Sequence, residues 1–260
     1  MIKKSLYYLF LLLSLIGLTS CGSPQEKPAR IEVERSDSVN ETAKQSLAPN
    51  LNAQERLGTQ WGEGIESKVS TVDLKRLSSQ PVDVSMIYYS AGNAKGTPIK
   101  EMMIANGKIG VSILNERDQK WTLMNGANNR VLLKGQDKAQ YKIRYHNLSN
   151  RIYEVVTTVD GLDVINGSAG SLSNSGYVLY PNQELIIEGF RKSQDEVAAF
   201  RFSSVQDAYA ANTPAGSASN TGVIGTAIFE LYDPSKVRTE PSAFPADQSN
   251  GQYAPPPQYR

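Results

Sequence analysis

Few residues of this 260-residue chain could serve as catalysts or metal ligands. It contains one His and one Cys, and its 27 Lys and Arg residues nearly balance 26 Asp and Glu residues. A single Cys excludes internal disulfides and multi-Cys zinc or iron–sulfur sites, and a single His excludes a multi-His zinc site. Nucleic-acid binders usually carry an excess of basic residues, so the charge balance argues against that class as well.

His146 is the only imidazole that a nucleophilic mechanism could use as a base. A catalytic triad would also need a serine and an acid, and the chain has no Gly-x-Ser-x-Gly motif to present the serine. We therefore interpret His146, which follows Tyr145 at the end of an expected strand, as a surface or turn residue. The sequence predicts no catalytic residue and no cofactor.

Asp160, Asp163 and Asn166 are spaced three residues apart, and oxygen ligands clustered on loops can bind Ca²⁺. The residue order of an EF-hand loop and its distal Glu are absent. Asp160-Gly161 is also a pair typical of tight hairpin turns. We favour the turn interpretation and predict no metal site.

Tyr177, Phe190 and Arg191 form the candidate binding surface. Phe190 would be the apolar anchor, next to the charged run that follows it, and tyrosines on β-surfaces can stack on sugars or fill partner pockets. Two loops rich in small polar residues, 167–176 and 212–221, could frame a binding edge. The alternative interpretation is a solvated turn with weak ion pairs and two ordinary connecting loops.

The elements that must position these residues are predicted to be strands. Segments rich in β-branched and aromatic residues recur about every 8–12 residues, with Gly and Asn between them. They cover residues 82–88, 102–114 with a break at Asn106-Gly107, 121–124, 131–133, 141–145, 152–159, 185–187, 197–202 and 223–231. Only 205–211 suggests a turn or two of helix. The pattern predicts an all-β chain with a single antiparallel β-sandwich, jelly-roll-like or Greek-key, over residues 56–232.

The N-terminus has the features of a secretory signal. Lys3 and Lys4 precede a mostly apolar stretch over 6–18, which is too short to span a bilayer comfortably. Leu18-Thr19-Ser20-Cys21 resembles the lipobox of bacterial lipoproteins. The resemblance implies cleavage after residue 20 and a diacylglyceryl thioether on Cys21. The alternatives are an uncleaved anchor helix and a chance Cys at the end of a signal peptide.

The lipobox resemblance also implies a location in the bacterial cell envelope. Buried acyl chains hold a protein at a bilayer by about 0.8 kcal/mol per CH₂. Gly22 rather than Asp follows Cys21, which implies the outer membrane in a host with two membranes. We expect residues 21–55 to be a flexible tether and 233–260 to be a Pro-rich disordered tail.

Several motifs of the predicted sandwich resemble an uncharacterised group of exported proteobacterial proteins. They are Leu57-Gly58-Thr59-Gln60-Trp61-Gly62-Glu63, Val159-Asp160-Gly161-Leu162-Asp163-Val164, Gly176-Tyr177-Val178, Gly189-Phe190-Arg191-Lys192-Ser193, Val197-Ala198-Ala199-Phe200 and Asn220-Thr221-Gly222-Val223-Ile224-Gly225. The resemblance implies export and one folded unit, without an activity.

The sequence thus predicts a cell-envelope lipoprotein that binds or scaffolds. Its partners would be the membrane, through Cys21, and an envelope protein or surface glycan, but no nucleic acid. We expect it not to be an enzyme. The first alternative is an envelope hydrolase with two loop carboxylates about 5–10 Å apart in a cleft. The second is a purely structural envelope component.

Overall fold

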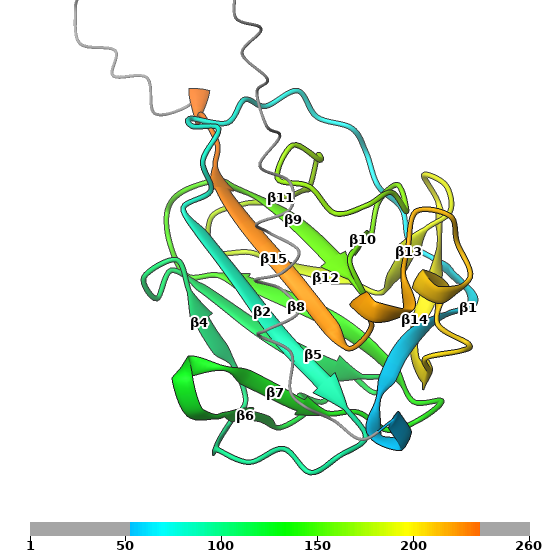
Figure 1. Cartoon of the computed structure of the whole chain (residues 1–260). Coiled ribbons are helices and arrows are strands. Elements are labelled where there is room, and N and C mark those ends of the chain that lie inside the picture. The colour runs from blue at the N-terminus through cyan, green and yellow to red at the C-terminus, as the bar shows by residue number, and fades with distance from the viewer. Residues whose placement is uncertain (1–52, 235–260) are drawn as a thin grey trace, which may run out of the picture. The chain divides into compact units, whose positions relative to one another are not determined.

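The computed structural model describes residues 53–234. Cys21, the predicted tether up to residue 52 and the Pro-rich tail from residue 235 lie outside this range. Within it the chain is nearly all β, as the sequence predicts, and its helical elements are short 3-10 turns (Figure 1). No helix between residues 53 and 234 has the length and apolar character to cross a membrane.

The strands form two sheets that pack as a sandwich, each named here after a central strand. The β8 sheet follows the order β1-β14-β8-β5-β4, with β12 beside β8 and β13 beside β14. Its strands are β1 (Leu57–Glu66), β4 (Met102–Ile104), β5 (Ile109–Asn115), β8 (Gln140–Asn147), β12 (Glu184–Ile187), β13 (Gly189–Arg191) and β14 (Glu196–Ser204).

The β15 sheet follows the order β10-β9-β15-β2-β7-β6-β3, with β11 beside β9. Its strands are β2 (Asp83–Ser90), β3 (Thr97–Ile99), β6 (Leu123–Asn125), β7 (Val131–Lys134), β9 (Tyr153–Val159), β10 (Leu162–Asp163), β11 (Tyr177–Leu179) and β15 (Val223–Glu230). Figure 1 shows β15 between β9 and β2. The paired strands of both sheets run antiparallel except β2 and β7, which are parallel.

The core lies between the sheets because side chains alternate along each strand. On β8, Tyr141, Ile143 and Tyr145 are fully buried. The intervening Lys142 and Arg144 point outwards, where they pair with Asp118 and Glu184. Aromatic rings form one continuous set of contacts that runs from the interior to the surface. The set comprises the buried Tyr89, Tyr141, Phe190, Phe200 and Phe202, the partly buried Trp121 and Tyr209, and the exposed Trp61.

Most expected strands are present with shifted ends. The break at Asn106-Gly107 separates β4 from β5, and Ala105, Asn106 and Gly107 all have positive φ angles. The helical turn expected over 205–211 shrinks to the 3-10 turn η3 (Tyr209–Ala211). Sequence periodicity did not reveal β1, β3, β10, β11 and β13. The remaining short helical elements are η1 (Ala53–Glu55), η2 (Ala127–Asn129) and η4 (Ala218–Asn220).

Candidate functional site

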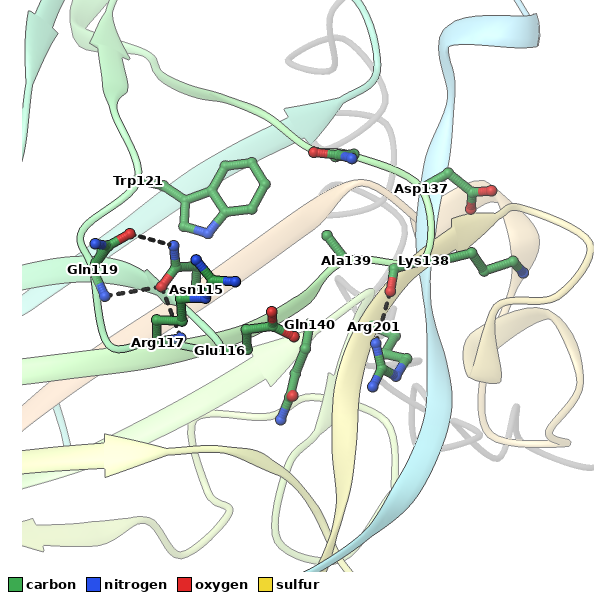
Figure 2. A pocket seen from close by; sticks show the side chains of 11 residues that line it. Asn115, Glu116, Arg117, Gln119, Trp121, Asp137, Lys138, Ala139, Gln140 and Arg201 are labelled. Atoms are coloured by element: carbon green, nitrogen blue, oxygen red, sulfur yellow. Dashed lines mark hydrogen bonds between the residues drawn. The ribbon is translucent and has the colours of Figure 1, made fainter.

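Two loops at one edge of the sandwich line an open pocket of about 440 Å³, named here the loop-edge pocket (Figure 2). One loop joins β5 to β6 and the other joins β7 to β8. Side chains from both loops and from the adjoining strand ends line the pocket: Asn115, Glu116, Arg117, Gln119, Trp121, Gln136, Asp137, Lys138, Ala139, Gln140 and Arg201. Most of them are polar or charged, so the pocket suits a ligand rich in hydrogen-bonding groups.

Asn115 fixes the conformation of the first loop. Its side-chain oxygen accepts hydrogen bonds from the backbone N–H groups of Arg117 and Gln119, both at 2.9 Å. Its amide Nδ2 donates to Gln119 Oε1 at 3.2 Å, and Asn115 N donates to Gln119 O at 2.9 Å (Figure 2). An Asn at the end of a strand commonly closes a turn in this way. The side chains of the loop therefore project from a defined backbone.

Arg201 joins the second loop to the β8 sheet. Its Nη1 donates to the carbonyl of Lys138 at 2.8 Å, and its guanidinium holds both carboxylate oxygens of Glu63. The hydrogen bond from Arg201 lowers the pKa of Glu63. Lys138 itself has a φ of 64° and donates its N–H to the carbonyl of Phe202 at 2.8 Å. The loop is thus fixed by backbone bonds that leave the side chains of Gln136 and Asp137 in solvent.

Trp121 is the one aromatic residue among the pocket-lining residues. Its backbone N–H donates to the carbonyl of Ile113 at 2.8 Å, and its indole meets the ring of Phe202 edge-on, with centroids 5.8 Å apart. The indole Nε1 is buried and makes no hydrogen bond within residues 53–234. Trp121 therefore belongs partly to the core and partly to the pocket.

The charges of the pocket nearly cancel. Arg117, Lys138 and Arg201 supply three positive charges, and Glu116 and Asp137 supply two negative ones. Glu63 neutralises Arg201 by a two-pronged ion pair from outside the lining. Two cations then face two carboxylates, so the cavity has no strong preference for an anion or a cation.

A second polar cluster is centred on Asp160 and lies inside the protein. The carboxylate of Asp160 is 1% exposed and accepts hydrogen bonds from Tyr89 Oη at 2.6 Å, Thr59 N at 2.7 Å and Gly222 N at 2.8 Å. Burial raises the pKa of Asp160 to about 6, although these hydrogen bonds act in the opposite direction. The Thr59 hydroxyl shares hydrogen bonds of 2.7 Å with the hydroxyls of Tyr89 and Tyr141.

The Asp160 cluster joins the two sheets rather than facing a ligand. Thr59 and Tyr141 belong to the β8 sheet, whereas Tyr89 and Asp160 lie on or next to strands of the β15 sheet. Three of the motifs noted in the sequence, 57–63, 159–164 and 220–225, meet at this one carboxylate. We interpret the cluster as structural because solvent does not reach it.

Asp163 and Asn166 are also used in a turn. Asp163 Oδ1 accepts from Ile165 N at 2.9 Å and Asn166 N at 3.0 Å, and Asp163 Oδ2 accepts from Asn174 Nδ2 at 3.2 Å. Asn166 in turn accepts two bonds from Ser168. In the described range, His, Cys, Asp and Glu residues form no group of three or more that could bind a metal.

The predicted binding surface is only partly exposed. The structure brings Tyr177 and Arg191 together, with Arg191 Nε donating to Tyr177 Oη at 2.7 Å and Nη1 donating to Ser67 O at 2.8 Å. Phe190 is 2% exposed and packs against Phe200 and Tyr209 in the core. Its ring is therefore not available as an anchor for a partner, and Arg191 serves to join three segments of the chain.

His146 lies near the end of β8, on the outer face, as expected from its alternation. It is opposite Glu184 in the register with β12, and its charge contributes to lowering the pKa of Glu184, after the larger effect of the hydrogen bond from Arg144. It is not among the residues that line the loop-edge pocket.

The sequence did not point to the loop-edge pocket. The available signal was a run of polar residues at 115–120, followed by Trp121, between two predicted strands. Comparison with known proteins adds no relative: no family model, no curated protein and no solved structure matches the chain.

Proposed function

We propose that this chain is a lipid-anchored protein of the bacterial cell envelope, and that its β-sandwich is a binding module. The lipobox resemblance at Leu18–Cys21 supports the anchor. The polar loop-edge pocket supports binding. The proposal places the module at the outer membrane in a host with two membranes, because Gly22 follows Cys21.

One observation carries the binding function: a cavity of about 440 Å³ formed by loops that hydrogen bonds hold in place. Ligand sites in proteins usually measure about 300–1,000 Å³ and are largely formed before the ligand arrives. Loops supported by a rigid sandwich are also a common place for recognition. The candidate surface at Tyr177 and Arg191 is less suitable, because its polar groups already bond each other.

The binding function can be tested with the full mature chain carrying Cys21→Ser, which removes the proposed anchor and leaves the pocket intact. We expect this protein to sediment with envelope fragments isolated from the host cell. Gln136→Ala/Gln140→Ala in the same chain should reduce the sedimenting fraction, whereas Trp61→Phe should not. Equal sedimentation of both variants, or none for the Cys21→Ser chain itself, would contradict the binding function and favour a purely structural component.

The anchor has a separate test. Labelled palmitate should enter the wild-type chain in cells and should not enter Cys21→Ser. Equal labelling of the two would contradict the anchor without affecting the pocket.

A second candidate function has one supporting observation. Glu116 and Asp137 are exposed carboxylates that line the same cavity from different loops, and a hydrolase of glycosidic bonds uses two carboxyl groups across a cleft. This alternative predicts that the protein releases new reducing ends from envelope polysaccharide. Glu116→Gln and Asp137→Asn should each abolish that release while the chain still sediments with envelope fragments. A binding module would leave the polysaccharide intact in all three proteins.

A further inference from the structure

We infer that the loop-edge pocket binds an uncharged saccharide. This inference rests on the proposed binding function and names the ligand class for the same site. Its support comes from the polarity and the charge of the pocket, which argue against other kinds of ligand, and from its single indole, which suits the face of a sugar.

The polarity of the lining excludes a lipid or another largely apolar ligand. Burying an apolar group against the amides and charges of this pocket would remove water from polar side chains without replacing its hydrogen bonds. Gln136 and Gln140 have side chains that make no hydrogen bond within residues 53–234, and each offers both a donor and an acceptor. Hydroxyl groups also donate and accept, so a ligand carrying many hydroxyls can use such a mixed set of partners.

The charge of the lining gives no net attraction to an anion such as a phosphate or a uronic acid. Arg201 forms an ion pair with Glu63, and the Nζ of Lys138 lies 3.9 Å from a carboxylate oxygen of Asp207. The carboxylates of Glu116 and Asp137 face the same cavity and would repel a second negative charge. Carboxylates are also good acceptors for sugar hydroxyls, which keeps them useful for a neutral ligand.

Trp121 supplies the remaining feature of a saccharide site. Sugars present C–H groups on one face, and an aromatic side chain with a polar tip can cover such a face while it donates a hydrogen bond. Figure 2 shows the indole of Trp121 beside Asn115 and Gln119 at one side of the pocket. Its Nε1 has no partner in the described structure, whereas a buried indole N–H normally has one. A ligand oxygen can therefore accept from Nε1 only after the side chains that cover this nitrogen move aside.

The chain permits a direct assay because it has only two tryptophans, Trp61 and Trp121. In Trp61→Phe, all tryptophan fluorescence comes from the pocket. We expect this variant of the full mature Cys21→Ser chain to give a saturable change in emission with neutral probes, namely cellobiose, maltose and chitobiose. Gln136→Ala/Gln140→Ala should weaken the binding of the best probe about tenfold, which corresponds to about one net hydrogen bond. Gln136 is exposed and Gln140 is half-buried, and Trp61→Phe keeps an aromatic ring against Phe190 and Tyr209, so these variants keep the fold.

The charged probes glucuronate and inorganic phosphate complete the experiment, together with an array of neutral mono- to tetrasaccharides. Tighter binding of either anion than of every neutral probe would overturn the inference. The inference would also be overturned if no saccharide of the array binds while the chain still sediments with envelope fragments. In that case the binding function would stand, with a ligand of another class. Failure of both assays would remove the proposed function as well.

Discussion

Asp160 is in an environment with two opposing effects. Complete burial favours the neutral carboxyl, whereas hydrogen bonds from Tyr89, Thr59 and Gly222 favour the carboxylate. Burial is the larger effect, so the pKa of Asp160 rises from 3.8 to about 6. Asp160 therefore joins the two sheets by hydrogen bonds and makes the free energy of unfolding depend on pH.

The direction of this dependence follows from proton binding. Between pH 3.8 and about 6 the folded state holds more protons on Asp160 than the unfolded state does, so its contribution to stability is present at low pH and is lost as pH rises through 6. The shift corresponds to about 3 kcal/mol. Urea unfolding of wild type and Asp160→Asn at several pH values should show a difference in free energy of unfolding that falls by about this amount between pH 4 and 7.

The comparison with Asp160→Asn is needed because other carboxylates act in the opposite direction. Arg201 and Arg144 lower the pKa values of Glu63 and Glu184, and the stability from those pairs is lost at low pH. Both pairs remain in the variant and cancel in the difference. A difference that stays constant from pH 4 to 7 would show that Asp160 has an ordinary pKa in the folded state.

The role of Asp160 illustrates what single residues reveal before a structure is known. Asp160-Gly161 was predictable as a hairpin turn, since Asp tolerates positive φ and Gly adopts it readily; their φ angles are 53° and 79°. Its burial was not predictable, because the partners Thr59 and Gly222 come from distant parts of the chain. The same applies to Phe190, whose type suits an anchor and a core residue equally well.

At the scale of elements, strands with one wet face were the easiest to predict. The alternation over 141–145 gave β8 because every second side chain faces the core. Strand β1 was missed because it contains Gly58, Gly62 and Gly64, which have low β-propensity and interrupt the pattern. It is nevertheless a full partner of β14 along most of its length, with an irregularity between Trp61 and Gly64.

The turn between β9 and β10 contains Gly161, and replacing this glycine tests how much the turn's stability depends on it. Gly161 has a φ of 79°, and a Cβ there would lie 3.0 Å from the Asn220 side chain. Gly107 has nearly the same φ, 77°, with open space around a Cβ. We expect Gly107→Ala to cost about 1 kcal/mol from backbone strain alone, and Gly161→Ala to cost more. Thermal or urea unfolding measures both.

The comparison separates backbone strain from crowding, because the two glycines have nearly the same φ and different space around a Cβ. Equal losses of stability would mean that the Asn220 side chain moves aside freely, and that the turn is tied less tightly to the 220–225 segment than the structure indicates.

At the scale of the whole molecule, Arg76 ties the segment between β1 and β2 to the β15 sheet. Its guanidinium bonds Glu154 Oε2 at 2.5 Å and the carbonyls of Leu172 and Asn174 at 2.6 Å each, and it lies 3.6 Å above the ring of Phe229. Phe229 belongs to a small apolar cluster, with Val156 and Ala227, that is separate from the main core. One side chain thus joins three distant segments.

Such assembly also explains why the loop-edge pocket escaped sequence analysis. The sequence of each loop is that of an ordinary polar connection. Arg201 lies more than sixty residues beyond the second loop in the sequence. The strand pattern indicated that loops would cluster at the ends of a sandwich, but not which loops would meet. The pairing of β5 and β14 with β8 brings these two loops together, and this pairing depends on the register between strands that are distant in the sequence.

Replacing Arg76 should therefore loosen the segment between β1 and β2 and leave the pocket intact. Arg76 and Glu154 are only 21% and 12% exposed, and removing one partner of such a pair leaves a poorly hydrated charge, which typically costs about 3 kcal/mol or more. We expect Arg76→Met to lower the free energy of unfolding and to open residues 67–82 to proteolysis.

Arg76→Met/Glu154→Gln separates the lost charge pairing from the lost anchoring of the segment. The double variant should recover part of the free energy of unfolding, because no unpaired carboxylate remains. Proteolysis in 67–82 should stay fast, because the carbonyls of Leu172 and Asn174 still lack their donor. None of the contacts of Arg76 involves a pocket residue, so the fluorescence of Trp121 should not change. Slow proteolysis in the double variant would mean that backbone bonds such as Leu77 N to Glu230 O hold the segment without Arg76.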